Sequence, residues 1–201
     1  MPQAQDRSQD DPSPQAGYTE ADLAYVRAEY RTLDELCADR PQTPQEIREL
    51  VAAGRLPRSA YVLPDGTEMF PPDYFALVDS AGGVEQLRAH FDDRHRVATT
   101  MLGTPGVDPE EDWVGYLSGQ YGVCLREVTP EAMVEKSALI ALIESLVAVP
   151  RPDDDAWRTQ LASAVDDLDE VERPFTDHDR QRWGGTSRDT HITAVRARFL
   201  A

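Results

Sequence analysis

The sequence has few of the residues that build disulfide frameworks, metal sites and membrane spans. Its two cysteines, Cys37 and Cys124, lie far apart and outside the spacing of paired metal ligands, so we expect neither a disulfide-stapled fold nor a zinc knuckle. The longest apolar run, residues 138–149, is too short to span a bilayer and is interrupted by Glu144 and Ser145. We therefore expect a protein of the reduced cytoplasm that does not enter a membrane.

Basic residues are also scarce. The 201 residues include 20 Lys and Arg against 37 Asp and Glu, which gives a formal net charge of −17, and Lys136 is the only lysine. Most of such a surface repels nucleic-acid phosphate and anionic lipid. The electrostatic partners of this protein are therefore expected to be cationic or neutral.

The first part of the chain predicts a disordered tail followed by short helices and a hairpin. Residues 1–17 are rich in Gln, Asp, Pro and Ser and lack the apolar segment of a secretion signal. Thr19, Thr32 and Thr43 are each followed three positions later by an acidic residue, a pattern that predicts a capped helix start. A Pro-Asp-Gly turn between apolar pairs then predicts a β-hairpin over residues 60–70.

A further helix is predicted from residue 71, a hinge at residues 79–83, and then helices separated by proline and glycine. Apolar residues at helical spacing, together with capping residues, predict helices that start near residues 84, 109, 130 and 155. A short turn around residues 176–182 and a last helix capped by Ser187 complete the chain. We expect a mainly α-helical fold in which a winged-helix-like part with a short β-hairpin, residues 18–83, packs on a helical bundle, residues 84–201.

One resemblance concerns the N-terminal part. It rests on Thr32-Leu-Asp-Glu-Leu36, Thr43-Pro-Gln-Glu-Ile-Arg48, Gly54-Arg-Leu-Pro57 and the hairpin that ends at Phe70. These segments resemble the winged helix-turn-helix of the mercury-resistance regulators and their excisionase relatives, in which the second helix enters the major groove of DNA.

The charge of this part disagrees with that function. Residues 32–80 contain four arginines and nine acidic residues, whereas a DNA-binding domain needs cations to neutralise phosphates. The second helix offers Glu46, Arg48 and Glu49 at the positions where basic or amide side chains are needed. We therefore expect no binding to nucleic acid and favour a retained scaffold or a protein-contact module.

The densest group of aromatic and polar side chains lies in residues 113–126, where Gly119 and Gly122 interrupt a predicted helix. Glycine permits close backbone approach, and polar atoms near it can face a small molecule. The substrate-binding candidates of this segment are Tyr116, Ser118, Tyr121 and Arg126. In the alternative interpretation the segment belongs to the core, and its glycines let two helices pack.

Candidates for chemistry are fewer. Tyr121 and His95 are the candidates for a general acid or base, although no spacing in the sequence connects them. His90 and His95 are five residues apart, which places them on different sides of a helix, unlike the four-residue separation of a helical zinc pair. Cys124 lies between Val123 and Leu125, which is typical of an inert packing thiol rather than a nucleophile. We expect no metal site and no tightly held cofactor.

Arg188 is a further substrate-binding candidate. If Ser187 caps a helix and Arg188 is its first residue, the free backbone N–H groups there form an anion site. In the alternative interpretation the arginines of this region pair with Glu172, Asp169 or Asp189 and fix the C-terminal helix.

A second resemblance spans most of the chain. It rests on Tyr116-Leu-Ser-Gly-Gln-Tyr-Gly-Val-Cys-Leu125, Thr129-Pro-Glu131, Leu168-Asp-Glu-Val-Glu-Arg-Pro-Phe175 and Gly184-Gly-Thr-Ser-Arg-Asp189. These segments look like an actinomycete family associated with natural-product and antibiotic biosynthesis, which has no catalytic motif to transfer. The resemblance implies a context and no mechanism. In that context we expect a protein that binds a small-molecule intermediate between its two parts, and the sequence leaves open whether it also transforms it. The alternatives are a ligand-responsive transcriptional regulator and a non-catalytic partner of a biosynthetic enzyme.

Overall fold

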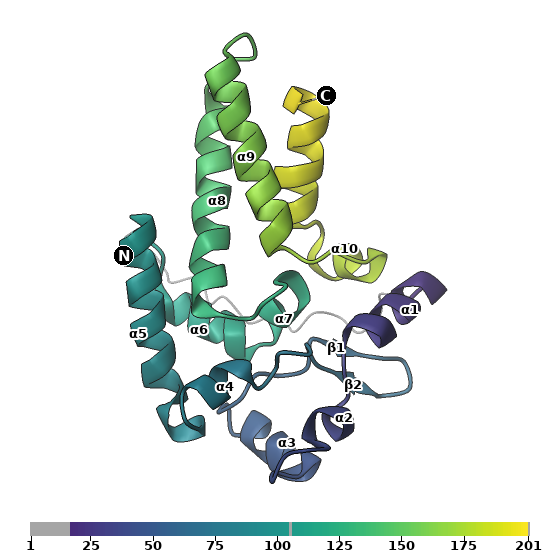
Figure 1. Ribbon diagram of the computed structural model, residues 1–201. Helices are drawn as coiled ribbons and strands as arrows, with labels where there is room; N and C mark the ends of the chain where they lie inside the picture. Colours follow the sequence, from purple (N-terminus) through teal and green to yellow (C-terminus); the bar gives the residue numbers. More distant parts are fainter. Residues whose placement is uncertain (1–16, 105, 201) are drawn as a thin grey trace, which may run out of the picture.

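The computed structural model describes residues 17–104 and 106–200. Over these residues the fold is mainly α-helical with one two-stranded antiparallel sheet, which confirms the predicted class (Figure 1). None of the helices in the described ranges is long and apolar enough to cross a membrane. The predicted tail, except for Gly17, lies outside the described residues.

The first three helices begin where the capping patterns predict. They are α1 (Glu20–Glu29), α2 (Leu33–Cys37) and α3 (Pro44–Ala52). The hydroxyls of Thr19, Thr32 and Thr43 each accept a hydrogen bond from the backbone N–H three residues on, and the acidic side chain at that position accepts one from the threonine N–H. These reciprocal bonds satisfy two of the backbone groups that a helix start leaves unpaired.

The predicted hairpin is present as β1 (Tyr61–Val62) and β2 (Glu68–Met69), paired with Tyr61 opposite Met69. It is attached to the end of α1, because Arg31 and Phe70 exchange backbone hydrogen bonds of 2.9 and 2.8 Å. The next helix, α4 (Ala76–Ser80), begins five residues later than predicted. Residues 71–75 form turns instead, with the N–H of Tyr74 donating to the carbonyl of Pro71 at 3.0 Å.

The remaining elements are helical. They are α5 (Val84–Leu102), α6 (Pro109–Leu117), α7 (Gln120–Cys124), α8 (Pro130–Ala148), α9 (Asp155–Val171), α10 (Asp177–Trp183) and two π-helical segments, η1 (Arg188–Thr193) and η2 (Arg196–Leu200). Figure 1 shows α8, α9 and the C-terminal segment rising together from the rest of the molecule. Residues 177–183 form a helix, where the sequence predicts a short turn around residues 176–182, because Thr176 and Asp179 make a fourth capping box.

The prediction that Ser187 caps the last helix is wrong. Its backbone is already helical, with φ −55° and ψ −39°, and its side chain makes no capping hydrogen bond. Thr186 takes that role, since its hydroxyl accepts from the N–H of Asp189 at 3.1 Å. The Ser187 hydroxyl donates instead to the carboxylate of Glu172, a partner that local sequence does not reveal.

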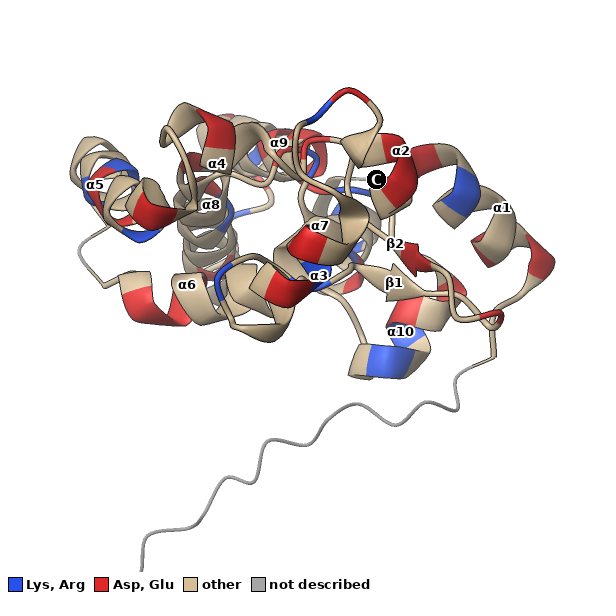
Figure 2. Cartoon of the chain, turned by 90° about the horizontal axis from the view of Figure 1, so that it is seen from below, with Lys and Arg blue, Asp and Glu red and all other residues tan. Residues whose placement is uncertain are grey.

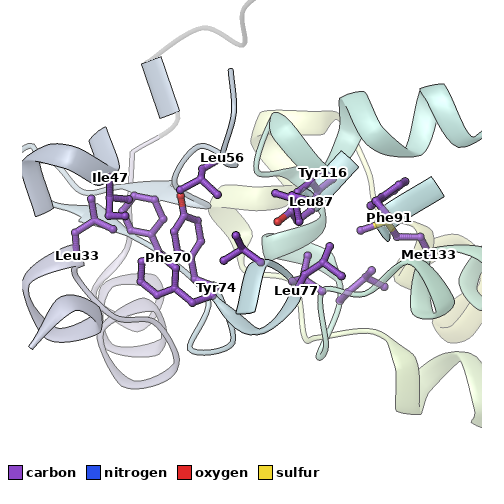
Figure 3. Packing of buried hydrophobic residues seen from close by; sticks show 14 of the residues in the cluster. Leu33, Ile47, Leu56, Phe70, Tyr74, Leu77, Leu87, Phe91, Tyr116 and Met133 are labelled. Carbon is purple, nitrogen blue, oxygen red and sulfur yellow. The ribbon is translucent and has the colours of Figure 1, made fainter. Parts of the chain in front are cut away.

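The two parts of the chain share one hydrophobic core. Buried side chains of the N-terminal part, among them Ile47 and Phe70, join Leu87 and Phe91 of α5 and Met133 of α8 in a single cluster (Figure 3). A separate cluster lies among α8, α9 and the C-terminal segment and centres on residues such as Ile143 and Leu161. Among the described residues, this second cluster contains no side chain from residues 18–83, although α8 also contributes Met133 to the first cluster.

Candidate functional site

Two residues that the sequence leaves unconnected, His95 and Tyr121, meet through Asp112. The Nε2 atom of His95 lies 2.8 Å from Oδ2 of Asp112, and the hydroxyl of Tyr121 donates to the other oxygen, Oδ1. His95 is 2% exposed and Asp112 is 5% exposed. We call these three residues the His95 cluster.

Three helices position this cluster. Leu87, Phe91 and His95 are each one helical turn apart, so His95 lies on the buried face of α5. Asp112 lies in the first turn of α6, and Tyr121 lies in α7.

Gly115, one turn after Asp112, makes room for the tyrosine ring. A Cβ atom on Gly115 would lie 2.8 Å from Cε2 of Tyr121, closer than real Cβ contacts. The absence of a side chain at this position therefore lets the Tyr121 ring lie against α6 with its hydroxyl on Asp112.

The hydrogen bonds set the tautomer of His95. An ionised carboxylate only accepts hydrogen bonds, so Asp112 receives the Nε2–H of His95 and the O–H of Tyr121. In the neutral imidazole the Nδ1 atom then carries a free lone pair; it lies 3.4 Å from the hydroxyl oxygen of Thr99, whose own hydrogen is donated to the backbone carbonyl of His95. Burial and the hydrogen bond to Asp112 raise the pKa of Tyr121 far above its usual value, so this residue remains a proton donor at neutral pH.

His95 and Thr99 line a groove between the C-terminal half of α5 and the chain leading into α6. The groove has a volume of about 740 Å³, and its other lining residues are Asp92, Arg96, Thr100, Gly103, Val107 and Pro109. Pockets for small organic ligands have volumes of about 300–1,000 Å³. The groove is thus large enough for such a ligand and places it beside a buried imidazole.

Tyr116, the first of the sequence-predicted binding residues, is a core residue. It is 2% exposed, and its hydroxyl has no hydrogen-bond partner among the described residues. It lines a cavity of about 10 Å³ between the two parts of the chain, which is too small for an organic molecule. Beside it, Gly119 has φ +81°, and a Cβ there would lie 2.7 Å from the carbonyl oxygen of Arg58, so this glycine serves close packing.

The other predicted binding residues do not gather around the groove. The hydroxyl of Ser118 donates to the carbonyl of Gly115 at 2.8 Å and helps to end α6. Arg126 is exposed, and its backbone N–H donates to Val171. Arg188 forms an ion pair with Asp169, as the structural alternative for this arginine predicts.

A second buried polar group, the Glu172 cluster, joins three distant segments. Glu172 is fully buried, and its Oε1 atom lies 2.9 Å from Nζ of Lys136 and accepts from the hydroxyl of Ser187. Burial opposes the charge on Lys136, but Cys124 and Glu172 outweigh it and raise the pKa of the lysine. Burial also raises the pKa of the Cys124 thiol, which favours the inert role for this cysteine.

Several arginines of the N-terminal part lie in ion pairs. Three of its arginines pair with carboxylates, Arg40 with Asp79 at 2.6 Å, Arg48 with Glu68 at 2.9 Å and Arg55 with Glu85 at 2.5 Å. In Figure 2, acidic residues lie beside the basic ones on α1 and α3. These ion pairs offset positive charge that a helix-turn-helix would use to neutralise phosphates.

The histidines diverge as their spacing predicts. Nε2 of His90 lies 3.1 Å from the hydroxyl of Ser80, whereas His95 faces Asp112. Across residues 17–104 and 106–200, no group of three or more His, Cys, Asp and Glu side chains could hold a metal ion.

Two carboxylates hold these clusters together. Sequence reasoning missed Asp112 and named Glu172 only as a partner of nearby arginines, not of Lys136 and Ser187. A signal for Asp112 was present, because it lies four residues before the core residue Tyr116 and so on the inward face of α6. Glu172 has no comparable signal, since it follows the end of α9.

Comparison with known proteins gives a family and no function. No curated protein and no solved structure matches the chain significantly. The model of a family of unknown function, DUF6058, matches residues 85–200, which is more than half of the chain and includes the whole His95 cluster, and the protein therefore belongs to this family.

Proposed function

We propose that the protein binds a small organic molecule in the groove beside His95 and that His95 exchanges a proton with it. The observation that carries the proposal is a buried His95–Asp112–Tyr121 chain at the wall of a groove of ligand size. The exchanging atom is Nδ1, because Nε2 is engaged by Asp112. Asp112 orients the imidazole and stabilises the imidazolium that forms, while Tyr121 fixes the second oxygen of Asp112.

The wider role that we propose is a step in natural-product biosynthesis in the cytoplasm. The resemblance to the actinomycete family supports this context, and the net charge of −17 favours a neutral or cationic intermediate. The groove requires no tightly held cofactor for proton transfer. A non-catalytic role as the partner of a biosynthetic enzyme is the alternative for the same context.

For the N-terminal part we propose a winged-helix-like module, packed on the helical bundle of residues 84–201, that contacts protein rather than DNA. The order α2, α3, β1, β2 supports the winged-helix assignment. The ion pairs of Arg40, Arg48 and Arg55 argue against a transcriptional regulator. A gel-shift at low salt with the promoter of the protein's own gene tests this: binding that competitor DNA does not remove would favour the regulator.

The groove proposal is tested by complementing a strain that lacks the gene. We expect the deletion strain to accumulate one intermediate, wild-type protein to remove it, and His95→Gln to fail at normal protein abundance. The matched control is His90→Gln, on the same helix but paired with Ser80 at the surface, which is expected to complement fully. Equal complementation by the two variants would overturn the role of His95.

A further inference from the structure

The α5 wall of the groove offers hydrogen-bond acceptors and few free donors. The hydroxyl of Thr99 donates its hydrogen to the backbone carbonyl of His95 at 2.8 Å, and that of Thr100 donates to Arg96 at 2.8 Å. A hydroxyl has one hydrogen to donate and two lone pairs. Both threonines therefore present only lone pairs and methyl groups to the groove.

The other polar side chains of the wall have the same character. Nδ1 of His95 is an acceptor, for the reason given above, and the carboxylate of Asp92 can only accept. Arg96 is the one strong donor among the groove residues of α5, and it forms an ion pair with Asp93. Arg88, the neighbouring cation, is already bound by Asp92 at 2.9 Å and by Glu110 at 2.8 Å.

The charge around the groove is negative as well, because the acidic residues of the first turn of α6 offset the positive dipole end of that helix. The C-terminal end of α5 borders the groove, and the last turn of this helix contains no basic residue that would offset the negative end of its dipole. The first turn of α6, on the other side, contains Glu110, Glu111 and Asp112. Residues 88–112 together carry six carboxylates and three arginines.

From this lining we infer that the groove binds a primary ammonium group, whose N–H bonds are directed to Thr99, Thr100 and His95. The inference rests on the proposed function, because it takes the groove as the ligand site. An ammonium group supplies both the positive charge that the surrounding carboxylates favour and the donors that the wall lacks. A carboxylate or phosphate ligand would instead bring negative charge and further acceptors, which this wall disfavours.

Four probes with the same ring separate charge from hydrogen bonding. They are benzylamine, benzyltrimethylammonium, benzyl alcohol and benzoate, each titrated into the ¹⁵N-labelled full chain while the amide shifts of residues 92–112 are followed. We expect benzylamine to bind most tightly, with benzyltrimethylammonium weaker by about 5–10-fold because it cannot donate. Benzoate is expected to leave these shifts unchanged.

Two variants locate the acceptors. Thr99→Val and Thr100→Val keep the side-chain shape and remove the lone pairs, and each is expected to weaken benzylamine by about 5-fold, the equivalent of one hydrogen bond. The control is Thr159→Val on α9, whose hydroxyl makes the same bond to its own helix at 2.8 Å but lies away from the groove. Benzylamine affinity in this control should equal that of the wild type.

The possible failures are distinct. Binding of benzyl alcohol or benzoate in the groove as tightly as benzylamine would overturn the inference and leave the groove a ligand site. Unchanged benzylamine affinity in both threonine variants would also overturn it. If no probe shifts residues 92–112, the ammonium inference fails, and the proposed function is then decided by whether His95→Gln complements the deletion strain.

Discussion

The His95 cluster and the Glu172 cluster are built alike. In each, a buried carboxylate accepts hydrogen bonds from two side chains that come from other helical segments. They differ in what lies beside them. His95 lines a groove of about 740 Å³, whereas Glu172 is fully buried and joins Lys136 of α8 to Ser187 at the start of η1.

The difference shows that a buried ionisable pair does not by itself indicate chemistry. Structural ion-pair networks perturb titratable groups as catalytic sites do. Glu172 also contributes backbone pairing, since it forms an isolated antiparallel bridge with Leu125. We therefore assign the Glu172 cluster to the assembly of α8, α9 and the C-terminal segment, and the proposed chemistry to the His95 cluster.

The largest expected effect comes from Lys136→Met, which leaves Glu172 buried without a counter-ion. Breaking a buried pair from one side costs about 3–5 kcal/mol, and we expect a loss of this size in the free energy of unfolding measured with urea. Adding Glu172→Gln to Lys136→Met should restore part of it, because the amide carries no charge. A loss below about 1 kcal/mol, the median for surface pairs, would contradict the structural role.

Gly115→Ala tests the support of the His95 cluster. The new Cβ would lie 2.8 Å from the Tyr121 ring, so Tyr121 must move away from Asp112. Overpacking of this kind costs about 1–3 kcal/mol of unfolding free energy. Gly106→Ala is the matched control, because a Cβ there meets nothing within 4 Å. If the two variants have the same stability, Gly115 is not needed for the ring position.

Tyr121→Phe removes one hydrogen bond to Asp112 and keeps the ring. We expect a loss of about 1 kcal/mol in the free energy of unfolding. The ¹⁵N shifts of the His95 ring should also change, since Asp112 then has one donor fewer. If the ¹⁵N shifts of the His95 ring are identical to those of the wild type, the Tyr121 hydroxyl does not act on His95 through Asp112.

The smallest expected effect concerns a pair at the surface. Hydrogen bonds from Arg40 lower the pKa of Asp79, so the pair stabilises the fold above the ordinary aspartate pKa and loses that contribution as the pH falls through the lowered value. Because Asp79 is half exposed, Asp79→Asn should cost less than about 1 kcal/mol at pH 7. The difference from wild type should vanish once the pH is below the lowered pKa of Asp79. A difference that persists there would implicate packing instead of charge.

The sequence predicted three helix starts that are set locally and missed a fourth of the same kind, at Thr176 and Asp179. The caps at Thr19, Thr32 and Thr43 depend on residues three positions apart, and all three helices begin there. Ser187 was assigned wrongly because its partner, Glu172, is 15 residues away.

The sequence predicted two residues of the candidate site but not the residue that joins them. His95 and Tyr121 were chosen for their chemistry, but Asp112 is one of three acidic residues in the first turn of α6, where acids are expected on any helix. The groove depends on the approach of α6 to α5, and no local pattern predicts that approach.

The shared core determines how much of the chain the family region needs in order to fold. The matched region begins at residue 85, yet its buried Leu87 and Phe91 belong to the same core cluster as Phe75 and Leu77 of the preceding segment. Cutting the chain at that boundary would uncover an apolar face beneath the same helix that carries His95. An expression fragment limited to the family region should therefore aggregate, and assays of the groove need the helices and hairpin that precede it.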